Sequence, residues 1–152
     1  MALDTKILVR KVEREDQESW LELFKAYILF YKSELTAEQY ELTWQRIHSD
    51  FNVNGLVAEV DGQIVGIAHY IFRPSTWAVN DFCYLEDLFV DPAIRGKGVG
   101  RALIEALEDI AMSEGSQRLY WTTAPDNATA RRLYDSVATT NRVQYRIALN
   151  PN

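Results

Sequence analysis

The sequence predicts a single α/β domain spanning residues 1–152, in which helices flank a mixed β-sheet. One observation is the order of the hydrophobic patterns, which read β-α-α-β-β-β-α-β-α-β along the chain. A second is the Asp61-Gly62 pair between two apolar runs, which is typical of a tight β-hairpin. A third is size, because 152 residues with 47% hydrophobic content suffice for one hydrophobic core.

In the first half of the chain, we expect two helices, each with a recognisable N-terminal capping residue, and three strands. Asp16 is a candidate N-cap for a helix whose apolar positions recur at helical spacing from Trp20 to Tyr31. Thr36 and Gln39 have the spacing of a capping box, which predicts a second helix running to about residue 47. The strands expected in this half are residues 6–12, 56–60 and 63–72.

The second half is organised around a cluster of glycines at positions 96, 98 and 100. A mostly apolar strand is expected before the cluster and an amphipathic helix after it, with Gly115 as the C-cap of that helix. Pro125-Asp126-Asn127 predicts the start of a shorter helix. The strands expected in this half are residues 81–90, 117–123 and 142–149.

Composition argues against several classes of protein. The net charge is −6 and neither half forms a basic arm, so we expect no nucleic-acid partner. A single cysteine, Cys83, and two distant histidines, His48 and His69, predict no metal site. No apolar run reaches about 18 residues and the first residues lack a signal-peptide pattern, so we expect a soluble, cytoplasmic protein without a membrane partner.

The segment from Val90 to Arg101, V-D-P-A-I-R-G-K-G-V-G-R, lies between the expected strand and helix. Glycines allow backbone N–H groups to approach a ligand closely, and a helix N-terminus adds partial positive charge. Together they favour a phosphate or pyrophosphate site, to which Arg95, Lys97 and Arg101 add side-chain charge. The alternative is a tight turn that merely starts a helix.

The spacing of the glycines fits neither a P-loop nor a dinucleotide-binding fingerprint. The pattern R-x-x-G-x-G, from Arg95 to Gly100, resembles the pyrophosphate loop of the GNAT superfamily of acetyl-CoA-dependent N-acetyltransferases. The runs Y-L-E-D-L-F-V before the loop and N-A-T-A-R-R-L-Y-D after it also resemble GNAT segments. More narrowly, the chain is similar to diamine and thialysine acetyltransferases and to the branch of yeast histone-and-other-protein and D-amino-acid acetyltransferases.

This resemblance implies the GNAT fold, a mixed central sheet with a splayed strand pair flanked by helices. It also implies transfer of acetyl from acetyl-CoA, a cosubstrate, to the primary amine of a small cationic or amino-acid-like acceptor such as a polyamine, lysine analogue or amino acid. Two alternatives remain open: a protein or histone lysine acetyltransferase, and a non-catalytic acyl-CoA-binding regulatory module. A homodimer is expected from the resemblance alone.

The resemblance also assigns roles to residues. The backbone of Leu88, Phe89 and Val90 would bind the pantetheine arm. The amides that would bind the pyrophosphate belong to Arg95, Gly96, Lys97, Gly98, Val99, Gly100 and Arg101. Asn127 would contact the coenzyme, and Tyr134 would protonate its departing thiolate. A core position is the alternative for Tyr134.

Two acids, Glu86 and Asp87, interrupt an otherwise apolar strand, where burial of a charge is costly without a partner or a function. By resemblance to the diamine enzymes, Glu86 is expected to be the base, directly or through water, and Asp87 to help hold the cationic amine. Neighbouring strand residues face opposite sides, so only one acid lines the acceptor cleft unless a bulge changes the alternation. The alternative is that one acid bonds a neighbouring backbone group or an arginine.

One departure from the family concerns the chain after Tyr134. Many members place a glycine there to turn the chain into the last strand, whereas D-S-V-A-T-T-N-R-V contains none. Asn141 is the candidate turn residue, because asparagine tolerates positive φ.

Overall fold

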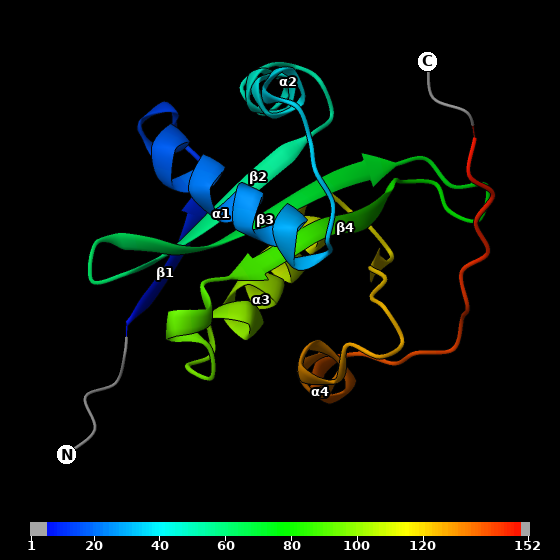
Figure 1. Cartoon of the computed structure of the whole chain (residues 1–152). Helices are drawn as coiled ribbons and strands as arrows, with labels where there is room; N and C mark the ends of the chain where they lie inside the picture. Colours follow the sequence, from blue (N-terminus) through cyan, green and yellow to red (C-terminus); the bar gives the residue numbers. More distant parts are fainter. Residues whose placement is uncertain (1–5, 150–152) are drawn as a thin grey trace. The chain divides into compact units, whose positions relative to one another are not determined.

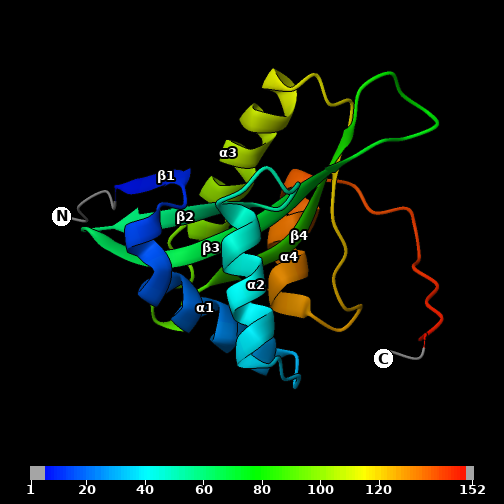
Figure 2. The ribbon, with the colours of Figure 1, turned by 90° about the horizontal axis from the view of Figure 1, so that it is seen from above.

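The computed structural model describes residues 6–149 and consists of two compact units, the first ending at Trp121 and the second beginning at Thr122. The first unit contains a five-stranded sheet in the order β1-β2-β3-β4-β5. Helices α1 and α2 lie on one face of this sheet and α3 lies on the other (Figures 1 and 2). The second unit contains α4. The predicted α/β architecture is confirmed, while the assignment of residues 1–152 to a single domain stays a prediction.

The strands are β1 (Ile7–Lys11), β2 (Asn54–Val60), β3 (Gln63–Arg73), β4 (Phe82–Val90) and β5 (Leu119–Tyr120). The helices are α1 (Gln17–Phe30), α2 (Ala37–Ile47), α3 (Val99–Ser113) and α4 (Ala128–Val137), with short 3-10 turns η1 (Arg14–Asp16) and η2 (Pro92–Ile94). Strands β1 to β4 pair antiparallel, and β5 pairs parallel to β4. The sheet is therefore mixed, as predicted.

At several positions, short sequence patterns adopt the local structures predicted from them. Both hydrogen bonds of the capping box are present at the start of α2, where Gln39 N–H donates to Thr36 Oγ1 and Thr36 N–H donates to Gln39 Oε1. Asp61 and Gly62 both have positive φ, +52° and +78°, which is the backbone of a type I′ hairpin turn. Gly115 follows α3 with φ of +77°.

Asp16 is the N-cap of α1, but its carboxylate does not cap that helix. It accepts instead from Glu13 N–H at 2.7 Å and from both terminal nitrogens of Arg10, at 2.7 and 3.0 Å. The Arg10 guanidinium lowers the pKa of this buried carboxyl. This ion pair joins β1 to the start of α1.

The face of the sheet under α1 and α2 carries an aromatic cluster. Trp20 and Phe24 from α1 pack with Trp44 from α2 over Ile67 and Phe89 of the sheet. On the opposite face, a Cβ added to Gly66 would meet Val99 and Leu103 of α3 at 3.1 and 3.2 Å. The absence of a side chain on Gly66 thus allows α3 to pack closely on the sheet.

Of the two strands predicted for the end of the chain, one is shorter than predicted and the other does not form. The strand expected at 117–123 is reduced to Leu119–Tyr120. No strand forms at 142–149, although its apolar residues alternate as expected. The apolar side chains of that segment are 79–93% exposed: Val143, Tyr145, Ile147 and Leu149. Alternation gives a strand only where a neighbouring strand supplies hydrogen bonds and cover, and within residues 6–149 the sheet does not include this segment.

Candidate functional site

A β-bulge in β4 lies at the first of the two consecutive acidic residues of that strand. His69 of β3 pairs with Asp87 and Tyr70 pairs with Leu85, so Glu86 is the extra residue at the register shift. His69 and Tyr70 are neighbours on β3 and face opposite sides of the sheet, so their partners Asp87 and Leu85 also face opposite sides. On a regular strand, residues two positions apart, such as 85 and 87, would face the same side. The bulge therefore changes the alternation, which is the possibility that the sequence raised.

Beyond this bulge, β4 has a strand partner on only one side. Its parallel pairing with β5 is limited to Cys83 with Leu119 and Tyr84 with Tyr120. The next part of β4, Leu88–Val90, pairs with β3 but with no second strand in the described residues. The two strands thus splay, and the edge of β4 from 88 to 90 can pair with an extended ligand.

The loop between β4 and α3 has the backbone of an anion-binding site. Gly96 and Gly98 have φ of +81° and +85°, and a Cβ added to either would meet no atom within 4 Å. Gly98 is the N-cap of α3 and provides no side-chain cap, and the backbone bonding of the helix begins with Ala102 N–H donating to Gly98 C=O. The first N–H groups of a helix have no partner within it, so they are available to a phosphate oxygen.

Arg95 lies against aromatic rings as well as the loop. Its guanidinium carbon is 5.8 Å from the ring centroids of Phe30 and of Phe89, and its Nε–H donates to Val90 C=O at 3.4 Å. Arg95, Lys97 and Arg101 are all exposed. The loop thus combines cationic side chains with its backbone N–H groups.

The Glu86 side chain is exposed. The protein groups around it nevertheless favour the protonated carboxyl over the carboxylate more than bulk water would. Desolvation by the surrounding protein raises the pKa of Glu86, and the negative charge of Asp87 raises it further. A carboxylate with a raised pKa is a stronger base than an ordinary one. Glu86 is therefore suited to accept a proton.

Asp87 bonds a histidine side chain, which is neither the neighbouring backbone group nor the arginine that the sequence offered as alternatives. His69 Nδ1 is 2.8 Å from Asp87 Oδ2, and Trp20 Nε1–H donates to His69 Nε2 at 2.8 Å. His69 and Trp20 are both buried. Their hydrogen bonds to each other and to Asp87 were not predicted, because no local spacing links three residues from α1, β3 and β4.

In the second unit, Asn127 and Tyr134 lie on one helix. Asn127 is the N-cap of α4, where its Oδ1 accepts from Ala130 N–H and its Nδ2–H donates to Thr123 Oγ1. Tyr134 is half-buried in the same helix. Asn127 therefore has a clear local role in starting α4.

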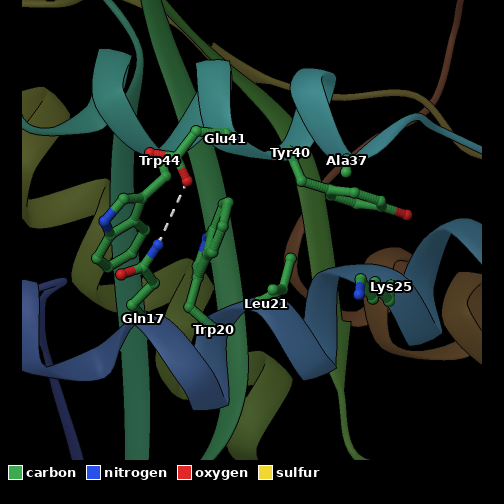
Figure 3. Close-up of a pocket in the computed structure, with 8 residues that line it drawn as sticks. All are labelled: Gln17, Trp20, Leu21, Lys25, Ala37, Tyr40, Glu41 and Trp44. Atoms are coloured by element: carbon green, nitrogen blue, oxygen red, sulfur yellow. Dashed lines mark hydrogen bonds between the residues drawn. The ribbon is translucent and has the colours of Figure 1, made fainter.

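A cavity of about 220 Å³ opens between α1 and α2 (Figure 3). Gln17 on α1 donates to Glu41 on α2 across it, at 3.5 Å. The cavity is lined by Gln17, Trp20, Leu21, Lys25, Ala37, Tyr40, Glu41 and Trp44. None of the predicted site residues lines it, so it is separate from the loop and from the two acids.

Within residues 6–149, no three histidine, cysteine or acidic side chains cluster closely enough to hold a metal ion. In the same range, no helix combines the length and apolar character needed to cross a membrane. The features present are a loop with the backbone of an anion-binding site, an unpaired edge of β4 beside it in the described residues, and a pair of acids preceding that edge. Such a site suits a ligand with a phosphate end and an extended amide-containing arm.

Comparison with known proteins agrees with this description. Residues 18–138 match the model of the acetyltransferase (GNAT) family. The D-amino-acid N-acetyltransferase HPA3 of Saccharomyces cerevisiae is 34% identical over 148 residues, 95% of this chain and 92% of that protein. A thialysine N-epsilon-acetyltransferase of Caenorhabditis elegans is 33% identical over 85 residues, 56% of this chain and about half (52%) of that protein. The aminoglycoside N-acetyltransferase AAC(6')-Iy in complex with CoA has the same fold, with a TM-score of 0.81 at 20% identity, covering 97% of this chain and 98% of that one.

Proposed function

The chain belongs to the GNAT family of acetyltransferases, and from this premise we propose that it transfers acetyl from acetyl-CoA to the primary amine of a small cationic or amino-acid-like acceptor. The observation that carries the proposal is the backbone of the β4–α3 loop, with two glycines at positive φ in front of the first N–H groups of α3. A protein lysine acceptor and a non-catalytic acyl-CoA-binding role remain the alternatives that the experiment below separates.

We propose that the loop and the free strand edge hold acetyl-CoA, which supplies the activated thioester. The amides of residues 95–101 would bind the pyrophosphate, with Arg95, Lys97 and Arg101 adding charge. The free edge at Leu88, Phe89 and Val90 would pair with the amide groups of the pantetheine arm. An N–H group near Phe89 would polarise the thioester carbonyl.

The acceptor amine must lose a proton before or during its attack on the thioester, because an ammonium group is not nucleophilic. We assign the base role to Glu86, acting directly or through water, and the binding of the cationic amine to Asp87. The raised pKa of Glu86 supports the first assignment, and the partial burial of the Asp87 side chain, 18% exposed, supports the second. We also propose that Asn127 contacts the coenzyme and that Tyr134 is the acid that protonates the departing thiolate.

An acceptor screen tests the proposed function. We expect acetyl-CoA to raise the Tm of the protein, with no comparable shift from NAD or ATP. Release of free thiol is then followed with polyamines, lysine analogues, D- and L-amino acids, and histone-tail peptides. Turnover of the small amines supports the proposal, turnover of the peptides alone favours the protein acetyltransferase, and binding without any thiol release favours the non-catalytic role.

Replacement of Glu86 by Gln should change the pH dependence of turnover. Because the base works only when deprotonated, the wild-type rate should fall as the pH drops through the pKa of Glu86, above the ordinary value of about 4.3. Glu86→Gln removes this group, so we expect a lower kcat and loss of that acidic limb. The measurement is kcat/KM of the amine against pH, and an unchanged profile would remove Glu86 from the base role.

We also propose that the enzyme is a homodimer in which residues 142–149 contribute to the interface. The support is the alternating row of exposed apolar side chains in a segment that is not among the strands of the sheet in residues 6–149. Val143→Glu with Ile147→Glu should convert a dimer to a monomer in light scattering, and a wild-type monomer would contradict the proposal. Cytoplasmic location and the absence of nucleic-acid and membrane partners stay predictions.

A further inference from the structure

A chain of two hydrogen bonds, one buried and one partly buried, runs from α1 through β3 to the acidic pair on β4. Trp20 Nε1–H donates to His69 Nε2, and His69 Nδ1 meets Asp87 Oδ2, both at 2.8 Å. Trp20 is 1% exposed and His69 3%, so neither side chain can exchange these bonds for water. Only Asp87, at the end of the chain, is partly accessible.

The chemistry of the indole fixes the tautomer of His69. An indole nitrogen only donates hydrogen bonds, so His69 Nε2 must be the acceptor. The proton of the neutral ring is then on Nδ1, from which it is donated to the Asp87 carboxylate. In the opposite tautomer, His69 Nε2–H would point at Trp20 Nε1–H, and the lone pair of His69 Nδ1 would face a lone pair of Asp87 Oδ2.

Packing also restrains the histidine ring. The Phe24 ring lies 4.7 Å from it, centroid to centroid, and the Trp20 ring lies 5.8 Å away. His69 and Asp87 are register partners directly beside the Glu86 bulge. A displacement of the ring would therefore be transmitted to Asp87, and the charge of Asp87 in turn acts on Glu86.

We propose that Trp20 and His69 are positioning residues for the acceptor amine, which act by holding the Asp87 carboxylate in one orientation toward the cationic group. This inference rests on the proposed function, since it assigns the binding of a cationic acceptor to Asp87. With Oδ2 taken by His69 Nδ1–H, the other oxygen, Oδ1, is the one directed to the acceptor. The indole N–H of Trp20 thus influences amine binding from a position that no substrate contacts.

Trp20→Phe tests this proposal, because it retains an aromatic ring and removes the N–H donor. We expect the KM of the amine to rise about 10-fold, the size of a lost hydrogen bond that orients a charged group, with the Kd of acetyl-CoA unchanged. Trp44→Phe is the matched control, because Trp44 is a buried tryptophan whose ring lies 4.8 Å from that of Trp20, centroid to centroid (Figure 3). The indole bonded to His69 Nε2 is that of Trp20, not Trp44. Equal effects of the two variants on the amine KM would overturn the proposal.

Two further measurements separate positioning from general packing. In an Asp87→Asn background, Trp20→Phe should have little additional effect on the amine KM, because the carboxylate that it orients is gone. His69→Asn, whose amide N–H can replace Nδ1–H, should retain more activity than His69→Leu. Additive effects of Trp20→Phe and Asp87→Asn would contradict the coupling.

The tautomer itself can be measured without turnover. Nitrogen-15 NMR of the histidines should show His69 protonated at Nδ1 in the wild-type protein and a mixed tautomer in Trp20→Phe. A wild-type ring protonated at Nε2 would overturn the inference even in an active enzyme. Failure of the proposed function is a different result, namely no thiol release from the wild-type protein with any amine.

Discussion

Replacement of Gly98 by Asp is expected to raise the Kd of acetyl-CoA at least ~100-fold. Gly98 precedes α3 with φ of +85°, and a Cβ there would enter open space where the proposed pyrophosphate binds. An aspartate at an N-cap accepts from the N–H groups of the first turn, so it would occupy the donors that the ligand needs. It would also repel the ligand, since two like charges 4 Å apart cost about 4 kcal/mol near a protein surface.

The hairpin glycine Gly62 provides the matched control for this substitution. Gly62 has φ of +78° and is also surrounded by open space, but it lies in the turn between β2 and β3. Gly62→Asp should bear a similar backbone strain, while leaving the Kd of acetyl-CoA within about twofold. Isothermal titration of both variants gives the comparison. Equal losses of affinity would show that backbone strain, rather than the anion site, causes the effect.

The parts of the fold that were predicted correctly depend on short-range signals. The capping box of Thr36 and Gln39 and the turn at Asp61-Gly62 are each determined by residues within four positions of one another. The glycines of the β4–α3 loop are of the same kind, because positive φ is a local requirement. These signals were sufficient to predict the order of the elements from β1 to α4 and the glycine loop between β4 and α3.

The parts that were missed depend on contacts between distant segments. His69 and Trp20 are 49 residues apart, and the sequence does not show that an indole N–H meets an imidazole. The position of the bulge at Glu86 depends on the register between β3 and β4. The alternating segment 142–149 predicted a strand, but a strand needs a partner, and that partner is not determined by the segment itself.

Replacement of Tyr134 by Phe is expected to lower kcat about 100-fold while leaving the Kd of acetyl-CoA within about twofold, because general acid catalysis typically contributes 10²–10⁴. The substitution removes only the phenol oxygen, which we propose protonates the departing thiolate. Tyr145→Phe is the control, because it removes the same hydroxyl from a tyrosine that is 93% exposed and whose proposed place in the dimer interface gives it no part in the chemistry.

A structural role for the Tyr134 hydroxyl gives a different result from an acid role. If the hydroxyl only stabilises α4, Tyr134→Phe should lower the Tm and affect kcat in proportion to the fraction of protein unfolded. If it is the acid, the Tm should stay close to that of the wild type while kcat falls at every pH at which the phenol is protonated. Stopped-flow measurement of thiol release in a single turnover distinguishes these outcomes, because it reports the acetyl-transfer step separately from product release. A single-turnover rate equal to that of Tyr145→Phe would remove Tyr134 from the mechanism.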